Sequence, residues 1–296
     1  MSSILTNSGA MVALQNLEAT QSNLNSVQNM ISTGLKVNSA KDDAATWVVS
    51  TTMKSNIASL NQVGTNLGNA DSILSTAGQG ATQIASLIQQ IRAAVTSTQD
   101  PSTNVAATQN NVDQLVSQIN ATVSSSNFNG VNLVDGSNAT GISFLAATAN
   151  DYTATGAAST TISTGNGADL NTSATGTDAT MKALYNLVDS GGTGGGLAAI
   201  TSATLDASLK TIDTAASTVK AAAAQFGAVQ SNVEGQQTFI TNLASTLQTG
   251  VGNMVDADMT AESAKLSALQ VQQQLGTQAL TIANQAPQML LKLFGA

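Results

Sequence analysis

The 296-residue sequence contains no cysteine and no histidine. It therefore forms no disulfide, and it offers no thiol nucleophile, no histidine-based catalytic triad and no Cys or His ligand for a metal. The 17 acidic residues are scattered along the chain. The tight pair Asp42 and Asp43 is explained by the start of a helix, and Asp256 and Asp258 are placed to cap the last helix. We assign no catalytic residue, no metal ligand and no cofactor, and an enzyme is the weakest functional hypothesis.

Charge and aromatic side chains are also scarce. Charged residues make up 9% of the chain and aromatic residues 3%, whereas an ordinary domain is about 25% charged. The nine basic residues are outnumbered by acidic ones, which leaves a net charge of −8. We expect no nucleic-acid partner, because such proteins carry a basic surface, and no anionic membrane partner. The small side chains that dominate the composition suit long helices packed side by side.

No long hydrophobic run is present. A membrane-spanning helix needs about 18 consecutive apolar residues, so we expect no span. The first 17 residues lack the basic start and the uninterrupted apolar stretch of a Sec-type signal peptide. The absence of cysteine fits a protein that is exported unfolded through a narrow path, and it also fits many cytosolic proteins.

What the sequence does contain is apolar residues repeated every seven positions near both ends. The N-terminal stripe consists of Leu14, Leu17, Leu24, Val27 and Ile31. The C-terminal stripe consists of Val233, Ile240, Leu243, Leu247, Val251 and Met254. A stripe that narrow cannot bury itself on one isolated helix. It needs helices from the far end of this chain or from other copies, which predicts a function in assembly.

The longest heptad run predicts one helix from about Asp42 to Asp100. Ser39 to Asp42 has the spacing of a capping box at its start, and Pro101 ends it. A helix of that length would extend about 80 Å. Its repeat consists of Leu60, Leu67, Leu74, Ala81, Ile88 and Val95. Four glycines interrupt it, and local weakness and close approach of neighbouring helices explain them equally well; they are Gly64, Gly68, Gly78 and Gly80.

The middle of the chain has a different character. A third helix is predicted from about Thr103 to Ser124, and an Asn-Gly turn follows it at Gly130. From Val131 to about Thr180 the chain is rich in small and polar residues, and we expect solvent-exposed hairpins and loops, with disorder as the competing interpretation. The glycine-rich segment 191–196 lacks the Lys-Ser/Thr of a phosphate-binding loop, so we interpret it as a linker.

Helix resumes near Leu205, and a last amphipathic helix extends from Ala261 to Phe294. The polar face of that helix carries glutamine instead of the Lys or Arg of a membrane-surface helix, which favours burial among other helices. The expected fold is mainly α, with long antiparallel helical rods, coiled-coil terminal helices and a small β-hairpin/loop outer segment. The predicted segments are an inner-core helix at 1–42, rod helices at 43–135, a variable surface segment at 136–200, a rod helix at 201–255 and an inner-core helix at 256–296.

Four stretches of the sequence resemble bacterial flagellin. Ile31 to Ala45, with the sequence ISTGLKVNSAKDDAA, resembles the most recognisable N-terminal signature of that family. Asn127 to Val131, NFNGV, resembles the motif at the end of its second N-terminal rod helix. Phe226 to Gln230 and Ala283 to Gln288 resemble its C-terminal motifs. The stretches occur in the family order and cover about 1–135 and 205–296, so a chance match is excluded in practice.

The resemblance implies a subunit that polymerises into the extracellular helical filament used for swimming motility. Both termini would then pair as helices that line the channel of the filament, and the rods would form a shell around them. For the inner-core self-assembly we expect Leu14, Leu17, Leu24, Val27, Ile31, Leu266, Leu269, Leu280, Leu290 and Phe294. For rod packing we expect Leu60, Leu67, Leu74, Ile88, Val95, Val233, Ile240 and Leu247.

The resemblance also implies partners and a route out of the cell. The main partner would be many copies of the same chain, and the others a flagellar export chaperone, hook-junction proteins and cap proteins. Such subunits are secreted unfolded through a type III apparatus, which agrees with the absence of a signal peptide. Toll-like receptor 5 senses many flagellins through a rod patch rich in Arg, Leu and Glu. Here only Arg92 and the apolar spacing remain of that patch, so we do not expect recognition.

Two alternatives to a filament subunit remain at this point. A hook–filament junction protein of the same system shares the terminal helices but does not polymerise extensively. A coiled-coil signalling or scaffold module is also compatible with heptads at both ends, although such modules carry many charged residues beside the stripe.

Trp47 lies where the family often has a small residue. We expect it to be buried in packing.

Overall fold

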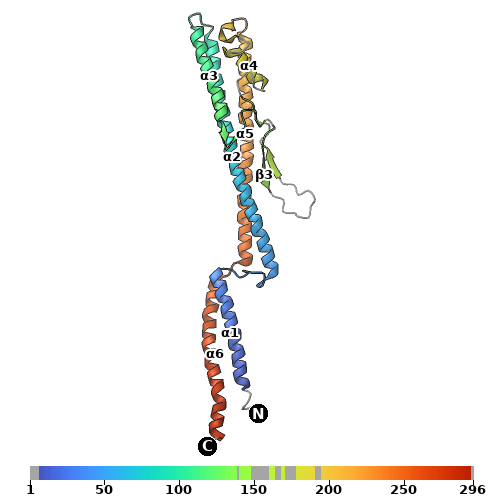
Figure 1. The fold of residues 1–296 in the computed structure, drawn as a ribbon, viewed down its shortest axis with the longest axis vertical. Helices are drawn as coiled ribbons and strands as arrows, with labels where there is room; N and C mark the ends of the chain where they lie inside the picture. The colour runs from blue at the N-terminus through green and yellow to red at the C-terminus, as the bar shows by residue number, and fades with distance from the viewer. Residues whose placement is uncertain are drawn as a thin grey trace. The chain divides into compact units, whose positions relative to one another are not determined.

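A computed structural model of the chain describes residues 7–138, 140–147, 160–163, 168–170, 178–190 and 195–294, with side chains left undescribed at 146–147, 160–163 and 286–294 (Figure 1). The mainly α fold is confirmed. The chain divides into two compact units. We call residues 1–57 with 245–296 the terminal unit, and residues 58–244 the central unit. The helices α2 (Ala44–Ser97) and α5 (Leu205–Val255) each contribute residues to both units.

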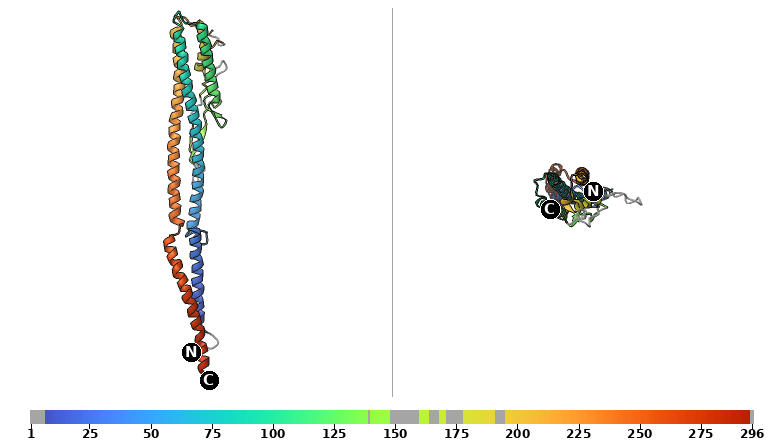
Figure 2. Two further views of the ribbon diagram at one scale, coloured as in Figure 1. Left: turned by 90° about the vertical axis from the view of Figure 1, so that its left-hand side faces the viewer. Right: turned by 90° about the horizontal axis from the view of Figure 1, so that it is seen from above.

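In the terminal unit, α1 (Ser8–Thr33) and α6 (Met259–Phe294) lie side by side in opposite directions (Figures 1 and 2). Their buried contact is small, and consists of Leu24, Val27 and Leu269 with Ile31 and Leu266 packed against them. Two polar contacts continue the pairing. The Asn7 side chain donates to the Ala283 carbonyl at 2.7 Å, and Gln273 donates to Gln21 at 2.6 Å. The pair therefore has a thin apolar seam with hydrogen bonds further along it.

The helix α1 ends at a glycine, the residue most common just past a helix C-terminus. Gly34 has a φ of +71°, and its N–H donates to the Met30 carbonyl at 2.8 Å. The chain is then held beside the end of α5, because the Lys36 N–H donates to the Val255 carbonyl at 2.7 Å. A second apolar cluster forms there from Val37, Val251 and Val255, with Leu35, Met53, Ile57 and Met254 packed against it.

The predicted capping box of Ser39 and Asp42 is wrong, because neither residue caps α2. The helix begins at Ala44, and Asp43 is its cap, because one carboxylate oxygen accepts from the N–H groups of Ala45 and Thr46. Asp42 instead closes the preceding turn by accepting from the hydroxyl and the N–H of Ser39. These hydrogen bonds lower the pKa of Asp42, with the Ser39 hydroxyl as the largest cause.

Asp256 and Asp258 were both predicted to cap α6, and only Asp258 does so. Asp258 accepts from the N–H groups of Thr260 and Ala261, so it is the cap. Asp256 lies in the connection before it, in a bridge with Leu35.

In the central unit, α3 (Val105–Ser125) forms a bundle with the C-terminal part of α2 and the N-terminal part of α5 (Figure 2). The two long helices are antiparallel, since Arg92 pairs with Asp213 and Gly68 lies beside Gln237. The largest fully buried side chains of these helices are Leu67, Leu74, Ile84, Ile88, Ile91, Ile119 and Phe226. Burying a side chain of this size stabilises a fold by about 1.5–3 kcal/mol, so this bundle holds most of the apolar core of the described chain.

Among the four glycines of α2, only Gly80 marks a tight approach to another segment. A Cβ at Gly80 would collide with the side chain of Ser126, just after α3. Ser126 is buried, and its hydroxyl donates to the Thr122 carbonyl at 2.7 Å. A Cβ at Gly68 would make ordinary contact with Gln237, and nothing lies within 4 Å of one at Gly64 or Gly78. The close approach of a neighbouring segment therefore explains Gly80, whereas local weakness of the helix is the interpretation left for Gly64 and Gly78.

We expect alanine at these glycines to change stability in opposite directions. Gly78→Ala gains helix propensity with no clash, so it should stabilise the central unit by up to about 1 kcal/mol. Gly80→Ala forces Ser126 away and should destabilise it by about 1–3 kcal/mol. Urea unfolding of the two single variants measures both effects. A Gly80→Ala chain as stable as the Gly78→Ala chain would contradict the close approach of Ser126 to Gly80.

The predicted turn after α3 is present as a hairpin. The strands β1 (Asn127–Phe128) and β2 (Val131–Asn132) pair antiparallel, and Asn129 and Gly130 have φ values of +51° and +83°. The buried Asn132 holds the hairpin to α3, because its side chain donates to the Val123 carbonyl at 2.7 Å.

A second hairpin lies in the segment for which solvent-exposed hairpins and loops are predicted. It pairs β3 (Ser143–Ala147) with β4 (Thr160–Ser163), and Phe144 lies opposite Ile162. Much of the remaining segment 131–180 lies outside the described residues.

One short helix, α4 (Ala179–Val188), was not predicted in the segment interpreted as hairpin and loop. Asp178 caps it, and Met181, Leu184 and Val188 are buried. A short 3-10 helix, η1 (Gly196–Ala199), follows. The glycine-rich linker lies outside the described residues at 191–194. A ten-residue helix with three buried side chains is too short to be stable by itself, so this helix depends on its packing.

Two side chains of α3 hold α4 and η1 in place. Gln109 donates to the Val188 carbonyl at 2.7 Å and accepts from the Leu197 N–H at 2.6 Å. Asp113 accepts from the N–H and the hydroxyl of Ser190. Burial would raise the pKa of Asp113, but the hydrogen bonds from Gln109 and Ser190 outweigh it and lower the pKa below its ordinary value of 3.8.

Candidate assembly surfaces

The residues predicted for rod packing lie mostly inside the chain. Seven of the eight are buried: Leu60, Leu67, Leu74, Ile88, Val95, Val233 and Ile240. Leu247 is partly exposed. Buried side chains of this kind stabilise the chain's own fold and present little surface to another copy.

The residues predicted for the inner core fall into three groups. Leu24, Val27 and Leu269 are buried in the contact between α1 and α6. Leu17, Ile31, Leu266 and Leu280 are partly exposed, and Leu14 is nearly half exposed. Leu290 and Phe294 belong to α6, but their side chains lie outside the described residues. The seam between the two helices therefore covers only part of the predicted set.

Large apolar side chains gather on the uncovered faces of the terminal unit. Of the twelve that are exposed in the described part of the chain, ten belong to this unit. Five on α1 and α6 are more than half exposed, namely Met11, Val12, Val271, Leu275 and Ile282. The central unit contributes Phe128 and Phe239. An apolar surface on this scale is typical of a binding surface.

These five residues are absent from the predicted assembly set. They lie off the face that the predicted residues share on each helix, so a search for one apolar face per helix passes over them. The signal was nevertheless present, because a helix that is apolar on more than one side is usually enclosed by other helices. The candidate site of this protein is thus the outward surface of α1 and α6.

The polar residues on these helices add little cost to burial. Hydroxyl groups donate to carbonyls one turn earlier in their own helix, as at Thr20, Thr33, Ser267 and Thr281. Glu18 is the single charged residue of α1, and the charged residues of α6, namely Glu262, Lys265 and Lys292, lie within its first two turns and its last turn. Burying a charge is far more costly than burying a satisfied hydroxyl or amide, so these helices are suited to contact with other helices on several sides.

Two other kinds of site have no support among the described residues. None of the described helices is long and apolar enough to cross a membrane. The same residues include no group of three or more acidic side chains that could hold a metal ion.

Comparison with known proteins identifies the family. The bacterial flagellin N-terminal helical region matches residues 4–139, and the bacterial flagellin C-terminal helical region matches residues 209–294. A flagellin of Brucella melitensis biotype 1 (strain 16M) is 36% identical over 300 residues, which cover 99% of each chain. The chain belongs to the bacterial flagellin family. Flagellin FljN of Caulobacter vibrioides is 38% identical over 298 residues, and flagellin C of Rhizobium meliloti (strain 1021) is 34% identical over 322 residues, each match covering 99% of both chains.

Membership confirms the function expected from the resemblance. The chain is a subunit of the flagellar filament, and neither the junction protein nor the signalling scaffold is favoured. Flagellin is a structural protein. The apolar surface of the terminal unit is therefore a candidate contact surface between copies of this flagellin.

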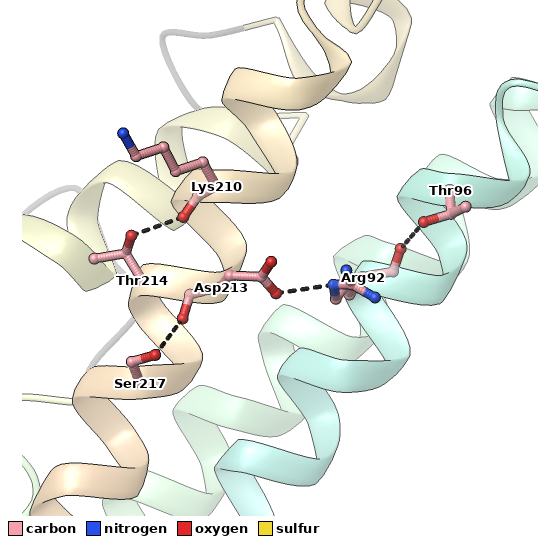
Figure 3. Close-up of polar contacts among 6 residues, drawn as sticks. All are labelled: Arg92, Thr96, Lys210, Asp213, Thr214 and Ser217. Carbon is pink, nitrogen blue, oxygen red and sulfur yellow. Dashed lines mark hydrogen bonds and ion pairs between the residues drawn. The ribbon is translucent and has the colours of Figure 1, made fainter.

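The rod patch around Arg92 is engaged within the chain (Figure 3). The Arg92 Nε atom lies 2.8 Å from Asp213 Oδ1, and this ion pair joins α2 to α5. Both side chains are about half exposed, so the pair contributes no more than about 1 kcal/mol. Nearby hydroxyls, at Thr96, Thr214 and Ser217, donate to carbonyls of their own helices. That Toll-like receptor 5 does not recognise this patch stays a prediction.

Proposed function

We propose that this flagellin polymerises through its terminal unit, with α1 and α6 in the inner layer of the filament wall. The predicted rod segments 43–135 and 201–255 would form the shell around that layer. The observation that carries this proposal is the outward apolar surface of α1 and α6, which includes Met11, Leu275 and Ile282. The seam buries three side chains, whereas five large apolar side chains of the pair are more than half exposed and open to other copies.

The kind of assembly follows from the two helices. The exposed apolar residues of α1 differ from those of α6, so one copy would present different faces to its neighbours. Contacts between unlike faces are heterologous, and they produce an open helical array when the rotation between copies does not close. A helical filament is such an array.

Export of the unfolded chain through the flagellar type III apparatus completes the proposal. An export chaperone would cover the apolar side of the C-terminal region before secretion, and cap and hook-junction proteins would contact the filament ends. The low content of charge and the absence of cysteine are compatible with passage as an extended chain. The filament would be extracellular.

Amide hydrogen exchange of monomer and polymer tests which unit is completed by assembly. In the monomer, the amides of α1 and α6 should exchange rapidly, because few buried side chains hold these helices. On polymerisation their protection should rise by at least about tenfold. The matched internal control is α3, whose five buried residues should protect it equally in both states. Protection that rises in the central unit and not in α1 or α6 would contradict the proposal.

A further inference from the structure

The tight turn between β1 and β2 consists of the dipeptide Asn129–Gly130. Both residues have positive φ, +51° and +83°, which is the geometry of a two-residue turn of type I′. In the described part of the chain, Asn129 is the one residue other than glycine with a positive φ. Asparagine tolerates that conformation better than most side chains. The turn therefore explains the backbone of Asn129, and it also places the side-chain amide of that residue next to the peptide bond of a glycine.

An asparagine that precedes glycine can lose its side-chain amide without an enzyme. The backbone nitrogen of Gly130 attacks the Cγ atom of Asn129, so that an N–Cγ bond forms and the Cγ–Nδ2 bond breaks. The proton of the attacking nitrogen leaves with Nδ2 as ammonia, and a succinimide ring remains. Water then opens either of two C–N bonds of the ring, which leaves aspartate or iso-aspartate at position 129. Glycine favours the attack because it has no Cβ to hinder its nitrogen.

No described residue shields this turn from solvent. Residues 127–130 are all exposed. A Cβ at Gly130 would have nothing within 4 Å. Water and base therefore reach the peptide bond between Asn129 and Gly130, and protection against the reaction has to come from the hairpin itself.

The attacking nitrogen is engaged by a nearby side chain. The Gly130 N–H donates to Oδ1 of Asn127 at 2.9 Å. Attack on Asn129 requires this nitrogen to lose its proton and to turn towards the Cγ atom. A hydrogen bond from the N–H stabilises the protonated nitrogen and holds it towards Asn127. The side chain of Asn127 thus opposes the reaction.

The hairpin is also fixed to the rod at the strand that follows the turn. The buried Asn132 donates to the Val123 carbonyl at 2.7 Å, and its Oδ1 accepts from the Val134 N–H at 2.8 Å. Asn127 lies opposite Asn132 in the strand pair. The bonds that hold Asn132 therefore keep Asn127 in place, and the attack needs a local opening of the hairpin.

We propose that Asn129 is a deamidation site that the folded hairpin protects, with Asn127 as the protecting residue. The unfolded chain lacks this hydrogen bond, so the modification accumulates in chains that stay unfolded and is suppressed by folding. The product adds a negative charge, and iso-aspartate lengthens the backbone of a turn built for two residues. The inference goes beyond the proposed function and does not depend on polymerisation.

The unmodified chain tests the protection. Folded monomer and the same chain unfolded in guanidinium chloride are incubated at one mildly alkaline pH and digested with pepsin. Mass spectrometry then follows the conversion of Asn129 in each sample. Conversion in the folded chain should be at least about tenfold slower, because only the opened hairpin reacts. Equal rates in the two samples would overturn the inference.

Two substitutions at Asn127 test the part played by its side chain. Asn127→Ala removes the acceptor, and conversion of Asn129 in the folded chain should become about fivefold faster, the factor that one ordinary hydrogen bond supplies. Asn127→Asp retains an acceptor for the Gly130 N–H, so the rate should stay within about twofold of that of the unmodified chain. An Asn127→Ala chain that reacts no faster than the unmodified chain would overturn the protecting role of Asn127. Equally fast reaction of both variants would overturn it as well.

Discussion

A chain that lacks residues 1–31 should not polymerise. The deletion removes most of α1, including Leu24 and Val27, and leaves Leu269 of α6 without its partners. It also removes the exposed Met11 and Val12 that we assign to contacts with other copies. Both the helix pair and its outward surface are lost together. Sedimentation and electron microscopy of the purified truncated chain measure the effect.

The central unit serves as the internal control for this deletion. Its buried residues lie within 58–244, so its thermal unfolding should be unchanged. A matched point variant of the full-length chain is Leu24→Asp, which places an unpaired charge in the seam and should weaken polymerisation strongly. Filaments of the truncated chain at the normal critical concentration would show that the terminal pair is not the assembly element.

The long helices could be predicted from sequence because each repeats its apolar stripe over many turns. The end of α2 was close to its predicted position for a local reason, since Pro101 disfavours helix before it. The end of α1 is equally local, because Gly34 adopts a positive φ there. Signals of this kind act within a few residues and need no knowledge of the tertiary structure.

Features that depend on distant contacts could not be predicted in the same way. The short helix α4 is held by Gln109 of α3, far away in sequence. The start of α2 was predicted within two residues, but its cap was misassigned, because Ser39 and Asp42 have the spacing of a capping box and instead form the preceding turn. Trp47 was predicted to be buried in packing and is instead 36% exposed, because its burial depends on which side of α2 the chain itself covers.

The candidate site shows the same limit. A heptad stripe identifies residues that pack against the nearest helix, and for Leu24 and Leu67 that helix belongs to the same chain. The large apolar residues that the chain leaves exposed, such as Met11 and Ile282, lie off the helix faces that carry the predicted residues. Sequence indicated that the protein assembles, and the structure distinguishes the residues that the chain buries within itself from those that it leaves exposed.

The second large effect is expected at two exposed residues of α6. Leu275 is 57% exposed and Ile282 68%. Glutamine at both positions retains helix propensity and size, and it matches the polar face of α6. Because these side chains have few contacts in the monomer, its unfolding free energy should change by less than about 0.5 kcal/mol. Burial of their exposed parts in a filament is worth about 2–4 kcal/mol.

A substitution at a buried residue of similar size should lower stability and leave polymerisation nearly unchanged, which is the opposite result. Leu74 is fully buried in the central unit, and Leu74→Ala should reduce the unfolding free energy by about 2–5 kcal/mol. Since Leu74 presents no surface to other copies, the folded variant should polymerise at nearly the normal critical concentration. The two variants therefore separate stability from assembly.

The most direct test of assembly through the terminal unit is the critical concentration of the Leu275→Gln/Ile282→Gln chain. We predict a rise of at least about 30-fold, which corresponds to the lower end of the burial energy, with the monomer folded as before. A critical concentration equal to that of the unmodified chain would show that the exposed face of α6 remains in solvent within the filament, and would contradict the proposed role of the terminal unit.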